Sequence, residues 1–209
     1  MKTLRQHNLQ HGFTLVEISI VLVIIGLLLG GVLKGGEIID NTKVKNVYNS
    51  YRELTAAVTS YQDRYTVIPG DDNAAATRGL PAGPTGLGTG NGNGYIDQAT
   101  FACVNGDTAR ESCQALYQLR LSGFISGADT AAPTHAYGGR IAVARTDGFI
   151  GGYSRPVGVC FEFLNNKTIR NLETKFDDQA FNTGSIRGNA NYAAFAPDGV
   201  NVANTCIAS

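Results

Sequence analysis

Residues 13–33 read FTLVEISIVLVIIGLLLGGVL, a run of 21 residues that contains one charged side chain, Glu17. At about 1.5 Å rise per residue, this run would form a helix of roughly 31 Å, the thickness of the hydrocarbon core of a bilayer. A buried helix of a soluble protein rarely runs this long without a polar face. A secretory signal peptide has a shorter apolar core, with small residues at its cleavage site. The run therefore predicts a membrane-spanning helix.

The two flanks of this run differ in charge. The preceding residues contain Lys2 and Arg5, whereas residues 34–45 mix lysines with acidic side chains. Basic residues next to a membrane helix favour the cytoplasmic side. We therefore expect the N-terminus to lie in the cytoplasm and the residues after the run to lie across the membrane.

Glu17 lies near the start of the apolar run, and insertion scales assign a carboxylate at a helix centre a cost of about 2.5–3.5 kcal/mol. No cation is within reach along the helix. Cleavage between Gly12 and Phe13 would create one, the α-amino group of Phe13. The amine of a neighbouring subunit would then neutralise Glu17 in an apolar core and set the axial offset between subunits. The alternative is a Glu17 that lies at the level of the lipid headgroups and stays solvated.

Residues 12–17, GFTLVE, together with the apolar run behind them, resemble the processing motif of type IV prepilins. This family includes type IV pilins and the pseudopilins of type II secretion. The resemblance implies cleavage after Gly12 by prepilin peptidase, N-methylation of Phe13 and assembly into a filament through the N-terminal helices. It also implies the partners: further copies of the chain, the peptidase, the inner-membrane assembly machinery, and membrane lipid before assembly.

The chain departs from many pilins at Lys34, where they carry a helix-kinking proline. Two G-x-x-x-G spacings, Gly26/Gly30 and Gly31/Gly35, are typical of membrane helices that approach each other closely. Glycine also destabilises a helix interior by about 1 kcal/mol relative to alanine. We therefore expect the glycines to favour helix packing and to provide a weak point in place of the proline.

After Gly36 the apolar pattern becomes amphipathic. Large apolar and tyrosine side chains recur mainly at steps of three and four. They are Val44, Val47, Tyr48, Tyr51, Leu54, Val58, Tyr61 and Tyr65. This stripe predicts a helix with one core-facing side that ends before Pro69-Gly70, so that residues 13–66 would form one helix of roughly 80 Å.

The remaining residues have the pattern of a globular head. Residues 111–125 predict a short helix, and residues 140–145, 158–164 and 192–196 predict strands. The expected fold class is α+β, a long N-terminal helix with a transmembrane first half, packed on a small antiparallel β-sheet head, as in type IV pilins. The expected parts are a leader (1–12), a transmembrane and filament-core helix (13–36), an amphipathic helix half (37–66) and the head (67–209).

Four cysteines lie beyond the apolar run: Cys103, Cys113, Cys160 and Cys206. An even number of cysteines in an exported domain favours disulfides. Four cysteines allow three pairings. We favour Cys103–Cys113, which are close in sequence, and Cys160–Cys206, which would tie the C-terminal tail to the body. Zinc is disfavoured, because the chain has no C-x-x-C pair.

No cofactor is expected, and calcium is the single candidate metal. Residues 91–97 have a faint likeness to a calcium loop, although threonines stand where acidic ligands would be needed. Residues 173–184 resemble the acidic loop near the C-terminal part of pseudopilin-like heads, which binds calcium in some members. Asp177 and Asp178 are therefore an alternative site, and a solvated turn is the simpler interpretation.

Charge and motif content argue against several function classes. The chain has 17 basic and 17 acidic side chains, and removal of the leader would leave 15 against 17, a net charge of −2. A nucleic-acid partner is therefore not expected. Outside the leader the single histidine is His135, and neither G-x-S-x-G nor a Walker motif is present, so we expect no enzyme.

The main hypothesis is a structural subunit of a type IV pilus-like filament. Its precursor would lie in the bacterial inner membrane, and the processed chain in an extracellular or periplasmic filament. Pseudopilin heads are often smaller and lack cysteine pairs, so the resemblance favours a pilus. The alternatives are a type II secretion pseudopilin, a membrane-tethered monomeric binding domain and a membrane-anchored hydrolase.

Overall fold

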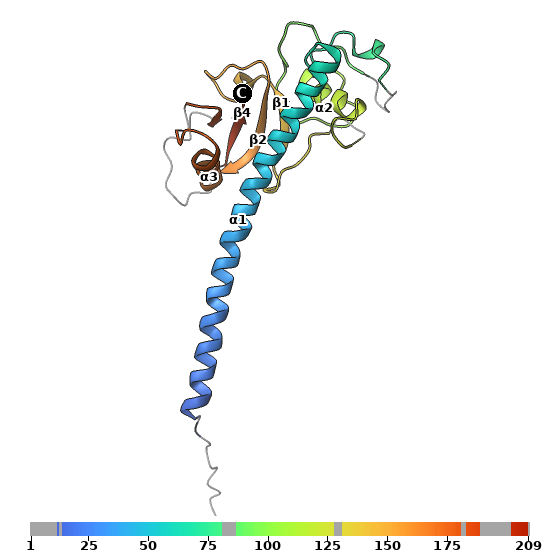
Figure 1. Ribbon diagram of the computed structural model, residues 1–209. Coiled ribbons are helices and arrows are strands. Elements are labelled where there is room, and N and C mark those ends of the chain that lie inside the picture. Colours follow the sequence, from blue (N-terminus) through green and yellow to red (C-terminus); the bar gives the residue numbers. More distant parts are fainter. Residues whose placement is uncertain are drawn as a thin grey trace, which may run out of the picture. The chain divides into compact units, whose positions relative to one another are not determined.

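The computed structural model describes residues 12, 14–80, 87–127, 131–180, 183–188 and 202–208. Its elements follow in the order α1 (Leu15–Tyr65), η1 (Ala75–Thr77), α2 (Glu111–Leu121), β1 (Ile141–Ala144), η2 (Thr146–Gly148), β2 (Gly158–Asn165), α3 (Asn166–Phe176), β3 (Ile186–Gly188) and β4 (Val202–Ile207) (Figure 1). The chain divides into two compact units, an N-terminal unit (Met1–Asn41) and a C-terminal unit (Thr42–Ser209). The expected α+β class and the long N-terminal helix are confirmed.

Helix α1 ends where the backbone leaves the right-handed helical region. Thr66 has a φ of 61°, and its N–H donates to the carbonyl oxygen of Gln62 at 2.7 Å. Pro69 follows, and a proline cannot continue the hydrogen-bonding pattern of a helix. The helix therefore covers residues 15–65 of the predicted 13–66.

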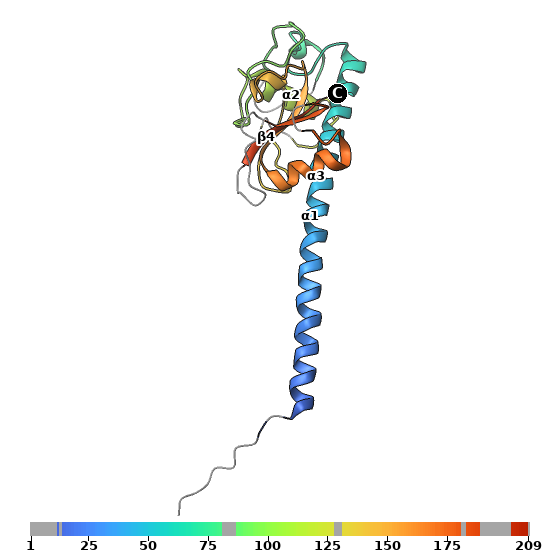
Figure 2. The ribbon, with the colours of Figure 1, turned by 90° about the vertical axis from the view of Figure 1, so that its left-hand side faces the viewer.

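Within the C-terminal unit, the second half of α1 contributes one face to the core. Figures 1 and 2 both show this part of α1 beside the sheet. Its buried side chains belong to the same cluster as buried residues of the sheet and of α2 and α3. They are Val44, Val47, Leu54, Ala57, Val58 and Tyr61. The stripe read from the sequence is thus the core-facing side of this helix, and Tyr48, Tyr51 and Tyr65 pack at its margin.

The sheet has four strands in the order β1-β2-β4-β3, and every neighbouring pair is antiparallel. The predicted strands at 140–145 and 158–164 are confirmed as β1 and β2. The predicted strand at 192–196 lies outside the described residues. Strands β3 and β4 were not predicted. The register of β2 against β4 shifts between Phe161 and Leu164, and Phe163 there has a φ of 58° and an exposed side chain.

Helix α3 was also not predicted, and the expectation of a loop from residue 173 onward is wrong at its start. Residues 173–176 form the last turn of this helix, so the loop begins at Asp177. The side chain of Asn165 caps the helix by accepting the N–H of Thr168 at 2.8 Å. Ile169 and Leu172 are fully buried, so the helix is amphipathic and covers part of the core.

The helix predicted at 111–125 is confirmed in its first eleven residues, as α2. It ends at Leu121, because Gly123 has a φ of 78° and the N–H of Phe124 turns back to the carbonyl oxygen of Leu119. This arrangement is the usual glycine-centred end of a helix.

Candidate functional site

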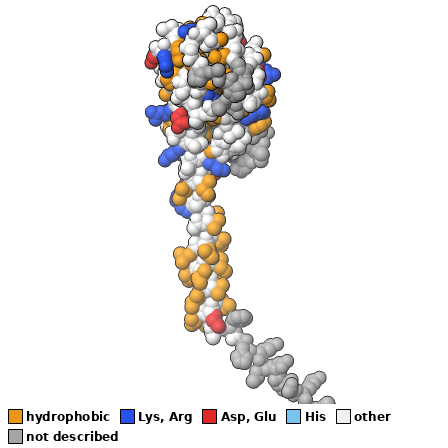
Figure 3. Space-filling view, turned by 90° about the vertical axis from the view of Figure 1, so that its right-hand side faces the viewer, with side chains coloured by type: hydrophobic (Ala, Val, Ile, Leu, Met, Phe, Trp, Pro, Cys, Tyr) orange, Lys and Arg blue, Asp and Glu red, His pale blue; other side chains and the backbone are white. Residues whose placement is uncertain are grey.

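The first half of α1 exposes its apolar side chains on every side. Between Leu15 and Leu33, the exposed fraction of the large apolar side chains runs from 46% at Ile25 to 91% at Leu15. Figure 3 shows these side chains covering the face in view. By length and composition, α1 is the one helix among the described residues that can cross a membrane, and its most apolar window has a mean hydropathy of 2.7.

Glu17 has a hydrogen-bonding partner inside the same chain. Its Oε2 accepts the backbone N–H of Thr14 and the hydroxyl of Thr14, each at 2.8 Å. In return, the N–H of Glu17 donates to Oγ1 of Thr14 at 3.2 Å. These reciprocal bonds form a capping box, in which a threonine and a glutamate three residues apart satisfy the first free N–H groups of a helix.

The capping box changes the interpretation of Glu17. Sequence reasoning searched for a cation and overlooked Thr14, although the Thr-x-x-Glu spacing was a visible signal. The carboxylate thus stabilises the start of α1 in a single subunit. Among the described residues, the bonds reach only Oε2, so Oε1 remains an acceptor for a donor from outside this part of the chain.

The expected cleavage point lies before the helix. Gly12 is exposed, and α1 begins three residues later, at Leu15. Phe13, the expected methylation site, lies outside the described residues. The backbone at Gly12 is therefore not helical, and no described side chain covers it.

The glycines of the apolar run have no packing role within the described chain. A Cβ placed on Gly26, Gly30, Gly31 or Gly35 would meet no atom within 4 Å. Helix α1 continues unbroken through all of them, so a weak point at these glycines stays a prediction. At the expected proline position, Lys34 forms an exposed ion pair with Glu37, with Nζ and Oε2 2.7 Å apart.

The glycine-rich loop at residues 91–97 is held by hydrogen bonds to carboxylates. The nearly buried carboxylate of Asp71 accepts the N–H groups of Gly92 at 2.6 Å, Asn93 at 3.0 Å and Gly94 at 2.7 Å. Three backbone donors therefore converge on one carboxylate, where a calcium loop would direct oxygen atoms toward an ion.

Glu111 and Asp97 complete this arrangement. Glu111, from the first turn of α2, accepts the N–H of Asn91 at 2.9 Å and the N–H of Asp97 at 2.7 Å. Oδ2 of Asp97 accepts the side-chain amide of Asn93 at 2.8 Å, and its Oδ1 accepts Nη1 of Arg145 at 2.9 Å. The oxygens of Asp71, Asp97 and Glu111 thus accept hydrogen bonds that hold the loop in place. They do not form a cluster of oxygen ligands for an ion.

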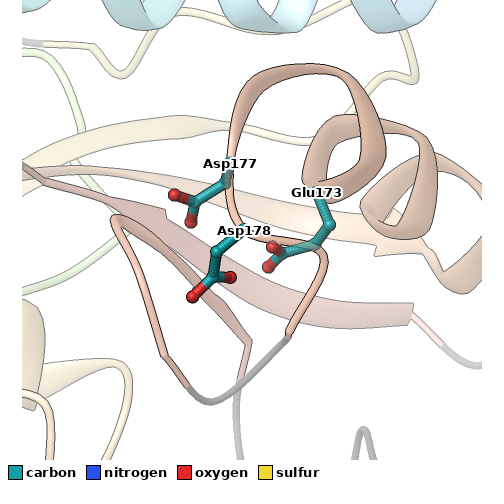
Figure 4. Close-up of side chains that lie close together, drawn as sticks. All are labelled: Glu173, Asp177 and Asp178. Carbon is teal, nitrogen blue, oxygen red and sulfur yellow. The ribbon is translucent and has the colours of Figure 1, made fainter.

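Three carboxylates gather instead at the end of α3. Figure 4 shows Glu173 in the last turn of the helix, with Asp177 and Asp178 directly after it. One oxygen from each carboxylate lies within 4.8 Å of the others, and this is the one group of at least three such side chains found among the described residues. Asp177 and Asp178 were candidates from the sequence. Glu173 was missed as a ligand, because its burial is a property of the tertiary structure.

The three carboxylates differ in their surroundings. Asp177 accepts the N–H of Ile186 at 2.7 Å, and Asp178 accepts the N–H of Ala180 at 3.0 Å and the hydroxyl of Thr183 at 2.6 Å. Glu173 is 3% exposed, and neither of its oxygens has a hydrogen-bond partner. Burial, and then the charges of Asp177 and Asp178, raise the pKa of Glu173 to about 7.

His135 is a buried structural residue. The N–H of Tyr137 donates to its Nδ1 at 3.2 Å, so Nε2 carries the proton and donates to the carbonyl oxygen of Glu162 at 2.7 Å. Burial lowers the pKa of His135, which keeps the ring neutral. Both ring nitrogens are thus engaged in the fold.

The structure joins the cysteines in two disulfides. Cys103 and Cys113 have an S–S distance of 2.04 Å, and Cys160 and Cys206 one of 1.99 Å. Cys160 and Cys206 stand opposite each other on β2 and β4, so this disulfide links two neighbouring strands of the sheet.

Comparisons with known proteins bear on the N-terminal unit alone. The family model of the prokaryotic N-terminal methylation motif matches residues 7–33. None of the curated proteins and none of the solved structures matches the chain. The matched residues contain Gly12, Phe13, the Thr14–Glu17 capping box and the exposed apolar run. The chain therefore carries the prepilin-type methylation motif of type IV pilins and pseudopilins, and this motif supports its assignment to the pilin or pseudopilin type.

Proposed function

We propose that this protein is a structural subunit of a type IV pilus-like filament. Its precursor spans the bacterial inner membrane with the N-terminus in the cytoplasm, and prepilin peptidase removes residues 1–12. Phe13 is then methylated, and the subunits assemble through residues 13–66. One observation carries this proposal: inside the matched motif, α1 exposes a membrane-length apolar surface that no other described part of the chain covers.

The exposed surface requires a different cover in each state of the subunit. In the membrane, lipid tails cover the apolar surface of α1. Helices associate there through close packing, because their apolar side chains are already out of water. Outside the membrane, each large apolar side chain left in water costs about 1.5–3 kcal/mol relative to burial. A subunit that leaves the bilayer must therefore have its helix covered by the helices of other subunits, and the glycines without Cβ atoms permit their close approach.

Glu17 provides the register between subunits in this proposal. The capping box holds its carboxylate at the start of α1, with Oε2 bound to Thr14. After cleavage, the methylated amine of Phe13 from a neighbouring subunit supplies the external donor. A charge pair in an apolar surrounding is stronger than in water, and an axial displacement would leave both charges unpaired.

The pilus is preferred over a pseudopilus because of the C-terminal unit. Its two disulfides suit an oxidising environment outside the cytoplasm. The unit is also large for a pseudopilin-type head, and it has the cysteine pairs that pseudopilins often lack. The amphipathic residues 37–66 would connect the filament core to this displayed unit, residues 67–209.

The proposal is tested on filaments sheared from the cell surface. Mass spectrometry of the purified filaments should find the chain with an N-terminal methylated Phe13. A processed chain found solely in the periplasm would indicate a pseudopilus. An unprocessed chain that retains residues 1–12 and never enters a filament would contradict the proposal.

Two substitutions separate the charge of Glu17 from its capping role. Glu17→Gln keeps the capping box, since glutamine serves at this position as well as glutamate, but it removes the charge. The matched control is Glu37→Gln, which removes an exposed carboxylate from the same helix. We expect Glu17→Gln to abolish filaments and Glu37→Gln to retain them. Wild-type filament yield from Glu17→Gln would refute the charge pair.

A further inference from the structure

Phe163 is a large apolar residue that the sheet turns outward. Along β2, Val159 and Phe161 face the core, so strict alternation would place Phe163 on the same face. The register against β4 shifts between Phe161 and Leu164, and Leu164 is the next residue of β2 in the core. A bulge of this kind re-aims a side chain. Phe163 is therefore 52% exposed, although its place in the strand would otherwise bury it.

The backbone at Phe163 is unfavourable for a residue of this kind. Its φ of 58° lies in the left-handed region, which bulky L residues rarely adopt. Asparagine and glycine adopt this region far more readily. The chain thus keeps a strained, exposed phenylalanine where a small or polar residue would suit the backbone better. Such strain collects at functional positions, and here it favours a contact of the ring with something outside the subunit.

An open apolar groove lies at the opposite end of β2, in the same C-terminal unit. It is enclosed by α1, the start of β2 and the end of β4, and its volume is about 190 Å³. Val58, Val159 and Ile207 are nearly buried and form its base, whereas Thr59 and Gln62 are more exposed and form its rim. None of the described residues that line it is charged. Because an apolar cavity of about 150 Å³ can bind benzene, the groove is large enough for a phenyl ring.

Phe163 cannot fill the groove of its own chain. The groove contacts β2 at Gly158 and Val159, and at about 3.4 Å per residue these positions lie roughly 14–17 Å along the strand from Phe163. A contact between the ring of one copy and the groove of another is therefore heterologous, so each copy offers Phe163 to one neighbour and its groove to the next. Heterologous contacts propagate as open filaments unless the rotation between copies closes a ring.

The contact is too small to hold two free chains together. A phenylalanine side chain buries about 150–250 Å², whereas a stable interface buries about 800 Å² on each partner. The occupant of the groove must therefore be kept beside it by another interaction. The exposed apolar run of α1 would provide this interaction for a second copy, at a high effective concentration in the proposed filament.

We propose that Phe163 of one subunit inserts into the groove between α1, β2 and β4 of a neighbouring subunit, and so couples the C-terminal units along the filament. This contact rests on the proposed function, because the N-terminal helices must bring the copies together. It gives the displayed units a directional contact of their own, in addition to the packing of the helices. Burial of the exposed half of the phenylalanine should favour each contact roughly three- to tenfold.

The first test is photo-cross-linking in whole cells that express the full-length chain. Phe163→p-azidophenylalanine places a light-activated group on the ring. Val104→p-azidophenylalanine is the control, since Val104 is an apolar residue with 63% exposure in the same unit. After reduction and trypsin digestion, the Phe163 probe lies in the peptide 146–167, and the α1 side of the groove lies in the peptide 53–64.

We expect covalent dimers in which these two peptides are joined, and no such pair with the control probe. Addition of Thr59→Trp, which fills the groove from its rim, should abolish these dimers. Processed filaments that give no dimer through these peptides, or dimers that persist with Thr59→Trp, would overturn the contact and leave the proposed function intact. An unprocessed chain that never assembles would contradict the proposed function, and the contact with it.

A second measurement separates docking from a role in folding. Asparagine tolerates the backbone conformation of Phe163, so Phe163→Asn should keep or raise the urea midpoint of the C-terminal unit in micelles. Sheared filaments of this variant should lose subunits roughly three- to tenfold faster than wild-type filaments. Val104→Asn is the matched control and should leave this rate unchanged. A lower urea midpoint for Phe163→Asn together with an unchanged dissociation rate would show that Phe163 serves the fold and not a contact between subunits.

Discussion

Removal of the Cys160–Cys206 disulfide should destabilise the C-terminal unit more than removal of the Cys103–Cys113 disulfide. The reason is the length of chain that each bond closes in the unfolded state. The separations are 46 residues for Cys160–Cys206 and 10 residues for Cys103–Cys113. The loop-closure relation gives about 4 kcal/mol for the longer loop and about 2.7 kcal/mol for the shorter one at 25 °C.

The two pairs are suitable for a direct comparison because their burial is similar. Cys113, Cys160 and Cys206 are fully buried, and Cys103 is 6% exposed. Replacement of both cysteines of a pair by alanine therefore removes two buried sulfur atoms in each variant. The packing losses are comparable, so the difference of about 1.3 kcal/mol in unfolding free energy reports the loop lengths.

The assay is urea unfolding of the full-length chain in micelles, followed by the near-ultraviolet circular dichroism of its tyrosines. The wild type, the Cys160→Ala/Cys206→Ala variant and the Cys103→Ala/Cys113→Ala variant are compared at one pH. Equal losses in the two variants, or a larger loss in the Cys103/Cys113 variant, would refute the argument from loop length.

Three further predictions concern single side chains. Thr14→Val removes the hydroxyl that caps α1 and should destabilise the first turn of the helix by about 1 kcal/mol. Hydrogen exchange of the amides near Glu17 should become faster, and the urea midpoint of the C-terminal unit should stay unchanged. Asp71→Ala removes the carboxylate that accepts three backbone N–H groups. Gly92 and Asn93 keep second acceptors, the carbonyl oxygen of residue 71 and Oδ1 of Asn91, so only the N–H of Gly94 is left without one. At about 1–3 kcal/mol for an unsatisfied donor, the unfolding free energy should fall by at least about 1 kcal/mol. A fall below about 1 kcal/mol would contradict this. Arg140 holds the pKa of Glu162 below its ordinary value of 4.5, so this carboxylate stabilises the fold above that pH and loses its contribution as pH falls through the lowered pKa. Unfolding free energy measured from pH 6 to pH 2 should therefore decline more steeply in the wild type than in Glu162→Gln, and parallel curves would count against the ion pair.

Much of α1 was predictable because its signals are local. The apolar run at residues 13–33 is long enough to span a bilayer, the stripe from Val44 to Tyr65 recurs mainly at steps of three and four, and the structure forms the helix over Leu15–Tyr65. The Thr-x-x-Glu spacing at Thr14 was equally local and was overlooked. The strands at 140–145 and 158–164 were also visible as short apolar runs.

Other features depend on contacts between distant parts of the chain. Strand β4 pairs with β2 across a gap of 46 residues at Cys160 and Cys206, and no local pattern specifies that register. Helix α3 has a short, mostly polar sequence, so its buried side could not be identified from the sequence. That side becomes apparent only where the helix packs on the core. The Cys160–Cys206 disulfide follows from this strand pairing, whereas Cys103–Cys113 joins residues only 10 positions apart; cysteine count alone allowed three arrangements.

By itself, the sequence determined the membrane-length helix and the carboxylate near its start, because these depend on composition and on spacing along one segment. The tertiary structure alone decided that Glu173 is buried and lies beside Asp177 and Asp178. The physical reason is that burial and convergence result from the packing of α3 and β3 in the C-terminal unit, whereas hydropathy and capping act between residues a few positions apart.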